Sequence, residues 1–283
     1  MVTLLLCLAC LLFTSCDYGL GEALYRPDPV NTRADCIYEL TAEQAPEVTK
    51  SRYQVLVFSD VHFGKKNADR HEQDLLQWLK AKKENGTCPE FCICLGDIAD
   101  HGTEDEFLAY VDFSKAIEEI LGSGRVYGVL GNHDLYNKGW KYYQSYVFPY
   151  KSFYHFKSKN FSWYFTDSAG GSMGKNQYTQ LVNAFNNDDS PKIVFSHVPI
   201  YGDPYTNMGY FTFQNSYEAD TILTLYVNSN VKMIVNGHIH KPHKNFFKSC
   251  IEFTLPSLTE DNEWLLLTID EDEASVKEEL IRP

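Results

Sequence analysis

The five residues Leu130-Gly131-Asn132-His133-Asp134 are the stretch around which the rest of this chain is organised. The run before them, Val126-Tyr127-Gly128-Val129-Leu130, is nearly all apolar and is typical of a buried strand. Gly131 allows a sharp turn, so three polar side chains able to bind metals or protons follow the strand directly. In open α/β sheets, ligands bind beyond the carboxyl ends of the strands. Asn and His also occur in ordinary turns, so the interpretation of this stretch depends on the other strands.

Four other stretches place Asp, Asn or His directly after an apolar run. They are Tyr53–Ser59 before Asp60-Val61-His62, Phe91–Leu95 before Gly96-Asp97, Lys192–Phe195 before Ser196-His197, and Val231–Val235 before Asn236-Gly237-His238-Ile239-His240. In an extended segment, side chains two positions apart point to the same side, so we expect Asp60 and His62 to share one ion. His238 and His240 have the same spacing. One pattern at five strand ends indicates a common site rather than five separate turns.

Helix-type stretches separate these predicted strands. Amphipathic or helix-forming patterns predict helices over residues 70–83, 104–121, 174–187 and 217–227. Residues 153–156 and 161–167 are predicted to form a hairpin, and residues 244–254, 263–269 and 274–281 alternate like antiparallel strands. Strands that alternate with helices predict an α/β layered core. The sequence shows no internal repeat and no clear second domain.

The composition is that of a globular protein with an acidic balance of charge. Of the 283 residues, 44% are hydrophobic and 22% are charged, which leaves ample material for a sizeable core. The formal net charge of −13 argues against general nucleic-acid binding, because proteins of that class carry a basic face. Anionic substrates remain compatible with this charge, since bound cations reverse the local field.

The chain contains eight Cys residues, three of which lie in the first 16 residues. The other five are Cys36, Cys88, Cys92, Cys94 and Cys250, an odd number that leaves at least one unpaired within the molecule. Cys92 and Cys94 share a face of a predicted strand, so we expect them to pack as small apolar residues. A disulfide with a distant Cys is the alternative.

Residues 1–15 are predicted to be a signal peptide of the lipoprotein type, with no charged side chain and an apolar run over residues 4–13. About ten apolar residues are too few to span a bilayer as a helix. Small residues directly before Cys16 resemble a bacterial lipobox, in which that Cys carries the lipid anchor. A secretory signal cleaved elsewhere and a short membrane anchor are the alternatives.

Residues 16–50 have little periodicity and are predicted to be a tether or N-terminal extension, as loop or loosely docked coil. Residues 51–283 are predicted to form the domain. This organisation predicts an exported protein that its lipid holds on a membrane, facing the periplasm or the cell surface. A secreted protein is the alternative.

The polar residues at the five strand ends form a consistent set of candidate site residues. The set is Asp60, His62, Asp97, Asn132, His133, Asp134, His197, His238 and His240. It offers carboxylate and amide oxygen and imidazole nitrogen without thiolate, which suits Mn, Fe or Zn. There are enough ligands for two ions. The other residues of these types are interpreted as structural, capping or supporting groups: His71, Asp100, His101, His155 and His243.

Two ions about 3.5–4 Å apart are the arrangement that hydrolyses phosphate esters. One solvent molecule bridges the ions, loses a proton and becomes the nucleophile, while the cations take up the charge that grows on the phosphoryl oxygens. An imidazole that is not a ligand can protonate the leaving oxygen. His133 is the candidate for this role because it follows a ligand, Asn132, and Asp134 can hold its ring.

These motifs resemble, in the same order, the five motifs of the calcineurin-like metallophosphoesterases. The resemblance rests on Asp60-x-His62, Gly96-Asp97, Gly131-Asn132-His133-Asp134, His197 and Gly237-His238-x-His240, and it extends from residue 51 to about residue 270. It implies a four-layer αββα sandwich of two mixed sheets flanked by helices.

The resemblance also implies how the ligands are divided. The first ion would be held by Asp60, His62, Asp97 and His240, and the second by Asp97, Asn132, His197 and His238. His133 would be the acid or a contact to the substrate phosphate, with Asp134 as its partner. Residues 196–201 and Asp167-Ser168 look closest to the purple-acid-phosphatase-like and cyclic-nucleotide-phosphodiesterase-like branches. Purple acid phosphatases have a tyrosine ligand where this chain has Asp100, which argues against a charge-transfer iron site.

The sequence therefore predicts a phosphoesterase that uses two metal ions on a small phosphoester substrate. The alternative is a surface lipoprotein that binds metal without catalysis, and the complete ligand set argues against it. The motifs do not distinguish monoesters from diesters. Lys65, Lys66, Tyr136 and Tyr201 are candidates to line the pocket, although solvated surface positions are the simpler interpretation.

Overall fold

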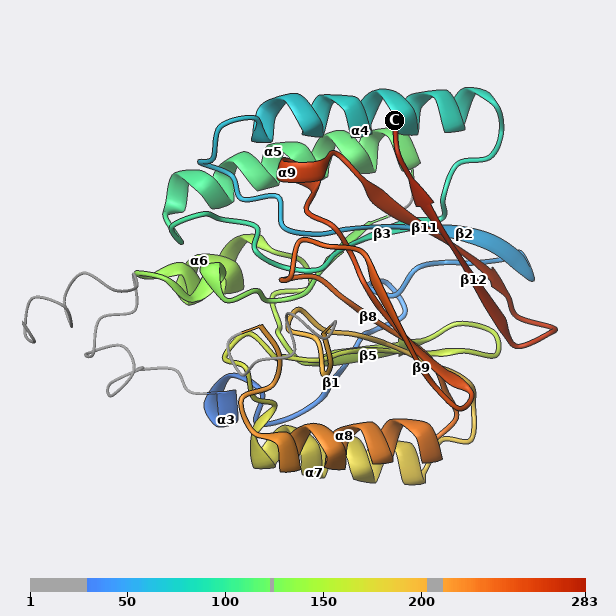
Figure 1. Cartoon of the computed structure of the whole chain (residues 1–283). Coiled ribbons are helices and arrows are strands. Elements are labelled where there is room, and N and C mark those ends of the chain that lie inside the picture. The colour runs from blue at the N-terminus through green and yellow to red at the C-terminus, as the bar shows by residue number, and fades with distance from the viewer. Residues whose placement is uncertain (1–29, 123–124, 203–210) are drawn as a thin grey trace, which may run out of the picture.

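Two mixed β-sheets form the middle of the molecule, and helices cover the outer face of each (Figure 1). The computed structural model describes residues 30–122, 125–202 and 211–283. In Figure 1 the covering helices are α4 (Ala68–Glu84) and α5 (Glu104–Leu121) above the sheets, and α7 (Gly174–Asn186) and α8 (Ser216–Asn228) below them. The predicted α/β class and the four-layer αββα arrangement are confirmed.

The five-stranded sheet carries the first three ligand-bearing strands. Its members are β2 (Arg52–Phe58), β3 (Phe91–Cys94), β4 (Val126–Gly128), β11 (Trp264–Asp270) and β12 (Ser275–Ile281). Their order in the sheet is β12-β11-β2-β3-β4. β2, β3 and β4 run parallel, whereas β11 pairs antiparallel with both β2 and β12. Every residue of β3 is buried, as its continuous apolar sequence predicts for a strand covered on both faces.

The seven-stranded sheet carries the other two ligand-bearing strands. Its members are β1 (Tyr38–Glu39), β5 (Tyr154–Lys157), β6 (Ser162–Phe165), β7 (Lys192–Phe195), β8 (Val231–Asn236), β9 (His243–Phe247) and β10 (Cys250–Thr254). Their order is β1-β5-β6-β7-β8-β10-β9. β6, β7, β8 and β10 run parallel, so their carboxyl ends meet at one edge. The predicted hairpin is confirmed, because β5 pairs antiparallel with β6.

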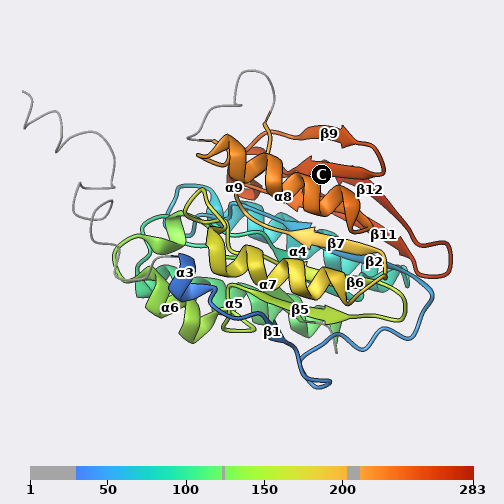
Figure 2. The same cartoon turned by 90° about the horizontal axis from the view of Figure 1, so that it is seen from below.

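Capping residues define where the long helices begin. The backbone N–H of Thr103 donates to Glu106 over 2.9 Å at the start of α5, and the Asn215 side chain accepts from the first amides of α8. Short elements escape prediction from periodicity because each offers too few turns. They are α3 (Val30–Arg33), α6 (Gly139–Tyr146), α9 (Leu258–Asp261) and a 3₁₀ turn at His133–Leu135. Figure 2 shows α7 and α8 side by side across the outer face of the seven-stranded sheet.

An aromatic core fills the space between the two sheets. The ring of Phe91 lies 5.2 Å from that of Trp163, and the ring of Tyr127 lies 5.3 Å from that of Phe156. Such tilted pairs stabilise a core beyond the area that they bury. Much of this core comes from the aromatic-rich region around β5 and β6. It gives the strands that lead into the site a rigid base.

Cys92 and Cys94 are buried on the other face of β3, in the layer that α4 and α5 cover. All five Cys residues in the described part of the chain are free thiols. Burial raises the pKa of both Cys92 and Cys94. The prediction that they pack as small apolar residues is confirmed.

The described part of the predicted tether, residues 30–50, corrects our expectation of a loosely docked coil. Helix α3 contacts α7, and β1 pairs with β5 in parallel at the edge of the seven-stranded sheet. The Arg33 side chain is buried in an ion pair with Asp167, a residue 134 positions away. Local patterns cannot reveal such a distant partner, so the packing of this segment escapes sequence analysis.

The predicted leader, including the predicted lipid anchor Cys16, lies outside the described residues. Within the described ranges, no helix combines the length and the apolar character that crossing a membrane requires.

Candidate metal centre

The predicted ligands gather at one edge of the molecule, where the carboxyl ends of strands from both sheets meet. Two groups of donor atoms result, and within each group all donor atoms lie within 4.8 Å of one another. The first, which we call the His240 group, contains Asp60, His62, Asp97 and His240. The second, which we call the His197 group, contains Asp97, His197 and His238. Asn132 joins the second, because its Oδ1 lies 3.0 Å from His197 Nε2.

Short distances connect the donors of the His240 group. His240 Nε2 lies 3.2 Å from Asp60 Oδ1 and 3.3 Å from His62 Nε2. Asp97 is shared by the two groups, because its Oδ2 lies 3.8 Å from His62 Nε2 and 3.3 Å from His197 Nε2. A carboxylate in this position can contact two neighbouring ions. The structure thus brings together each of the two ligand sets that the resemblance implied.

The backbone of the ligand segments is not extended, contrary to our expectation. β2 ends at Phe58 and β8 at Asn236, before the ligands begin. The ligands with a left-handed backbone are Asp60 (φ 56°), His62 (φ 48°), Asp97 (φ 48°), His238 (φ 71°) and His240 (φ 58°). This conformation is costly for residues other than glycine, and such strain concentrates at functional sites. Asp60 and His62 therefore converge through left-handed turns and not through the alternation of a strand.

Contacts between neighbouring loops hold this strained backbone in place. Asp60 N donates to Gly96 O over 3.1 Å, and His62 N donates to Asp97 O over 2.9 Å. A Cβ atom on Gly131 would stand 2.0 Å from Asp97 N. Only glycine permits this approach, which explains why the turn after β4 begins with Gly131.

The outer ring nitrogens of three ligand histidines have partners that orient their rings. His197 Nδ1 donates to Leu95 O over 2.7 Å, and His240 Nδ1 lies 3.0 Å from Glu260 Oε2. His62 Nδ1 lies 3.2 Å from Asp100 Oδ1, without hydrogen-bond geometry. In each ring Nε2 then faces the shared donors. Partners of this kind are typical around metal-binding histidines, so the residues present fit a metal site.

Neighbouring carboxylates favour the protonated form of two of these rings, those of His197 and His240. Burial disfavours the charged form of both, but Asp97 and Asp60 raise the pKa of His197 to about 9, and Asp60 and Glu260 raise that of His240 to about 10. Burial likewise opposes ionisation of Asp97, yet His197, His133 and His62 hold its pKa well below the usual range. In the metal-free chain His197 and His240 therefore carry protons, and a metal must displace them to bind.

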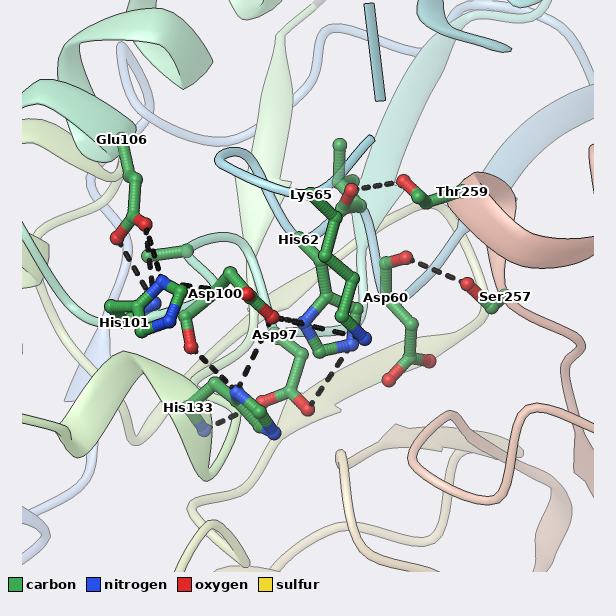
Figure 3. A network of polar contacts seen from close by, with 12 residues as sticks. Asp60, His62, Lys65, Asp97, Asp100, His101, Glu106, His133, Ser257 and Thr259 are labelled. Carbon is green, nitrogen blue, oxygen red and sulfur yellow. Dashed lines mark hydrogen bonds and ion pairs between the residues drawn. The ribbon is translucent and has the colours of Figure 1, made fainter. Parts of the chain in front are cut away.

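His133 lies beside the two groups, in the network of Figure 3. Its Nδ1 donates to Asp100 O over 2.7 Å and lies 3.8 Å from Asp100 Oδ1. Its side chain is 26% exposed, whereas those of His62 and His197 are buried. His62, Asp100 and His133 also satisfy the distance criterion for a metal. We interpret them as a supporting network, because His133 Nδ1 is already bonded to a backbone carbonyl.

Asp134 does not hold the ring of His133, which corrects the role that we predicted for it. Its carboxylate accepts hydrogen bonds from the backbone N–H groups of Ile98, Ala99 and Gly131 over 2.9–3.0 Å. The side chain is fully buried, and burial and the charge of Asp97 raise its pKa to about 7. Asp134 therefore ties the loop after β3 to the turn after β4.

Asp100 is the residue that the sequence analysis left out and that the structure places in contact with two site histidines. Its position three residues after Asp97 was the available signal. Lys65, one of the candidate pocket residues, has its Nζ 3.7 Å from Asp100 Oδ1 (Figure 3). The same Nζ lies 3.5 Å from Glu260 Oε1. Tyr136 lies with its ring 4.5 Å from that of His133.

Of the other two pocket candidates, Lys66 is exposed, and the hydroxyl of Tyr201 donates to Asp220 on α8, which is not a predicted ligand.

Comparisons with known proteins agree with this geometry. A family model described as calcineurin-like phosphoesterase matches residues 53–242, and no curated protein matches the chain. The chain is similar in structure to GAP50, the anchor in the inner membrane complex of Plasmodium, at 15% identity and a TM-score of 0.60, over 82% of this chain and 85% of that one. It is also similar to the purple acid phosphatase PPD1 from yellow lupin (Lupinus luteus) seeds, at 13% identity and a TM-score of 0.64, over 84% of this chain and 52% of that one. At these identities the likeness shows a shared fold.

Proposed function

This chain belongs to the calcineurin-like phosphoesterases, a family of metal-dependent hydrolases, and from that premise we propose that it hydrolyses small phosphoesters with two metal ions bound side by side. The observation that carries the proposal is the position of Asp97, which is shared by the His240 group and the His197 group. A shared carboxylate favours a pair of adjacent ions over two separate sites. Oxygen and imidazole donors favour Mn, Fe or Zn as those ions.

Ions bound at this site supply Lewis acidity toward the phosphoryl oxygens and a solvent molecule acidified enough to act as nucleophile. The chain contributes the positions of the donors, because outer partners fix the rings of His62, His197 and His240. Burial of Asp60 and Asp97 keeps bulk water away from the place where charge develops. Left-handed backbone at the ligands makes this arrangement available before substrate binds.

His133 is the proton donor to the leaving oxygen in this proposal. Its Nδ1 is bonded to Asp100 O, so Nε2 is the nitrogen that can face the substrate. The Asp100 carboxylate lies 3.8 Å from the same Nδ1, on the side of the ring that faces away from Nε2. His133 is partly exposed and lies next to His62, with 4.7 Å between ring centres, so a substrate that reaches the ions also reaches His133.

The test is hydrolysis of p-nitrophenyl phosphate and bis-p-nitrophenyl phosphate by the purified protein with Mn²⁺, Zn²⁺ or Fe²⁺ added. Asp97→Asn should abolish turnover of whichever ester is used, because it weakens both groups at once. Asp112→Asn, on the exposed face of α5, is the matched control and should leave the rate unchanged. Full activity in the Asp97 variant would contradict the proposal.

The alternative is a protein that binds metal without catalysis. A protein whose name describes it as an anchor shares this fold, and a fold alone does not decide function. Two equivalents of bound metal, measured by elemental analysis, together with no turnover in a broad phosphoester panel would favour this alternative. Turnover that depends on added metal would exclude it.

We also propose that the protein is exported and lipid-anchored through Cys16, on the strength of the leader sequence. In cells, Cys16→Ala should move the protein from the membrane fraction to the soluble fraction. An unchanged distribution would leave the other two interpretations of the leader, a secretory signal and a short anchor.

A further inference from the structure

The N-terminal segment, residues 30–50, is held to the rest of the molecule by a buried ion pair. Arg33 Nε and Nη2 donate to the two carboxylate oxygens of Asp167, each over 2.9 Å. The side chains are 1% and 0% exposed. A two-point pair of this kind fixes orientation as well as distance. Arg33 lies outside residues 53–242, the range that the family model matches, whereas its partner Asp167 lies within that range.

Asp167 continues directly into a contact with the His197 loop. Asp167 and Ser168 follow β6, and the Ser168 hydroxyl accepts hydrogen bonds from His197 N over 3.1 Å and from Val198 N over 2.8 Å. Asp167 itself is fixed on its other side, because its backbone N–H donates to Gln177 on α7. Arg33 is therefore connected to the backbone of His197 through Asp167 and the next residue, Ser168.

A second contact of Arg33 is with an aromatic ring of helix α6. Its guanidinium lies 5.9 Å from the ring centre of Trp140 on α6, the helix that follows His133. The segment is also held independently of Arg33, because Asn31 accepts a hydrogen bond from Asn176 N and β1 pairs with β5. Loss of the Arg33 charge would thus loosen the contact with Asp167 without releasing the whole segment.

We propose that Arg33 is a positioning residue for the metal centre, which acts through Asp167 and Ser168 to fix the backbone of His197. The proposal rests on the proposed function only in taking the His197 group as a metal site. The N-terminal segment would then help to set the metal affinity of that group. This chain of contacts ends at His197, which belongs to the His197 group and not to the His240 group, so the effect should fall mainly on one of the two ions.

The experiment is a calorimetric titration of metal-free full-length protein with Mn²⁺, in the parent, Arg33→Ala and Arg33→Lys. Second-layer changes at metal sites typically weaken binding about 10–100-fold. We expect Arg33→Ala to weaken one of the two binding events by that factor and to leave the other within about threefold. Arg33→Lys keeps the charge but loses the two-point contact, so its effect should be smaller and in the same direction.

A matched control separates positioning from loss of stability. Lys192 begins β7, the same strand that leads to His197, and its buried Nζ donates to the carbonyl oxygens of Ser190 and Ser229. Lys192→Met therefore disturbs this strand at its far end. At an equal loss of thermal stability, it should leave both binding events unchanged.

Hydrogen exchange of the metal-free protein gives a readout that needs neither metal nor substrate. The amides of His197 and Val198 should exchange faster in Arg33→Lys than in the parent, because their acceptor Ser168 is less well held. If Arg33→Ala does not fold, the Mn²⁺ titration and the hydrogen exchange of Arg33→Lys together test the proposal. Unchanged binding and exchange in Arg33→Lys, or equal losses in Lys192→Met, would overturn the proposal. An inactive protein with one weakened binding event would instead support it and contradict the proposed function.

Discussion

The His240 group and the His197 group share Asp97 but are supported in different ways. Charged side chains near the surface support the first: His240 contacts Glu260, which is 51% exposed, and His62 contacts Asp100. A backbone carbonyl and the buried contacts through Ser168 support the second, where His197 is fully buried. The ion of the His240 group should therefore respond to salt and to surface substitutions, and that of the His197 group to changes in packing.

The largest expected effect comes from a substitution that disrupts the His240 group and the His197 group together. In Gly131→Ala the new Cβ would stand 2.0 Å from Asp97 N, and backbone atoms cannot move aside cheaply. We expect loss of both Mn²⁺ binding events and of activity, with a fold destabilised by about 3 kcal/mol or more. Titration and thermal unfolding measure these outcomes.

Gly86→Ala is the control for that substitution. Gly86 has a positive φ of 68°, and a Cβ there would meet nothing within 4 Å. It should cost about 1 kcal/mol of stability and leave metal binding intact. Two normal binding events in Gly131→Ala would mean that the close approach of the loops is not required.

The next effect leaves both groups intact and removes the proton donor beside them. His133→Ala should lower kcat by about 10²–10⁴-fold, with both metals bound as in the parent. The loss should be greater for an alkyl phosphate than for a p-nitrophenyl ester, whose leaving group needs little protonation. His101→Ala, a change to an exposed ring in the same network, is the control and should alter kcat little. An equal loss for both esters would show that His133 is not the acid.

The pH dependence of metal affinity should distinguish the two groups, because His197 and His240 lose their protons in different pH ranges. The raised pKa values of His197 (about 9) and His240 (about 10) mean that each group releases about one proton when it binds metal near pH 7.5. Affinity should rise about tenfold per pH unit for each ion, levelling first for the His197 group. Calorimetry in two buffers of different ionisation enthalpy counts the protons. If no proton is released on metal binding, His197 and His240 are not protonated in the metal-free protein as expected.

The same shifts affect folding of the metal-free protein, with a definite sign. Both rings have folded-state pKa values above the ordinary value of 6.5, so their stabilising contribution is complete below that pH. It is lost as the pH rises toward 9 and 10. The melting temperature of the metal-free protein should therefore fall between pH 6.5 and 9.5. Bound metal should largely remove this dependence.

Residue types at strand ends were enough to predict which polar side chains lie together, because the parallel strands bring their polar ends to one edge. The conformation of those tips was not predictable. Left-handed φ at Asp60 and His238 depends on contacts with loops that lie far away in sequence. The same holds for Asp100, which replaced Asp134 as the partner of His133, and for Arg33, whose partner is 134 residues away. Local patterns thus predict which residues take part, while tertiary contacts decide what each one does.

The smallest expected effect is that of substituting Lys65, which lies beside the carboxylates that support the His240 group. Lys65 Nζ lies 3.7 Å from Asp100 and 3.5 Å from Glu260, so its positive charge stands beside both carboxylates. A single ammonium about 7 Å from a phosphoryl group in partly solvated surroundings contributes of order 1 kcal/mol per unit charge, or about fivefold. Lys65→Ala should therefore raise KM about fivefold for a monoanionic diester and more for a dianionic monoester, with kcat nearly unchanged. Lys66→Ala, one residue further along the exposed loop, removes the same charge without the contact and should change KM less than twofold. Equal effects of the two variants would reduce the role of Lys65 to the general field of the surface, and a fall in kcat alone would mean that Lys65 acts by holding Asp100.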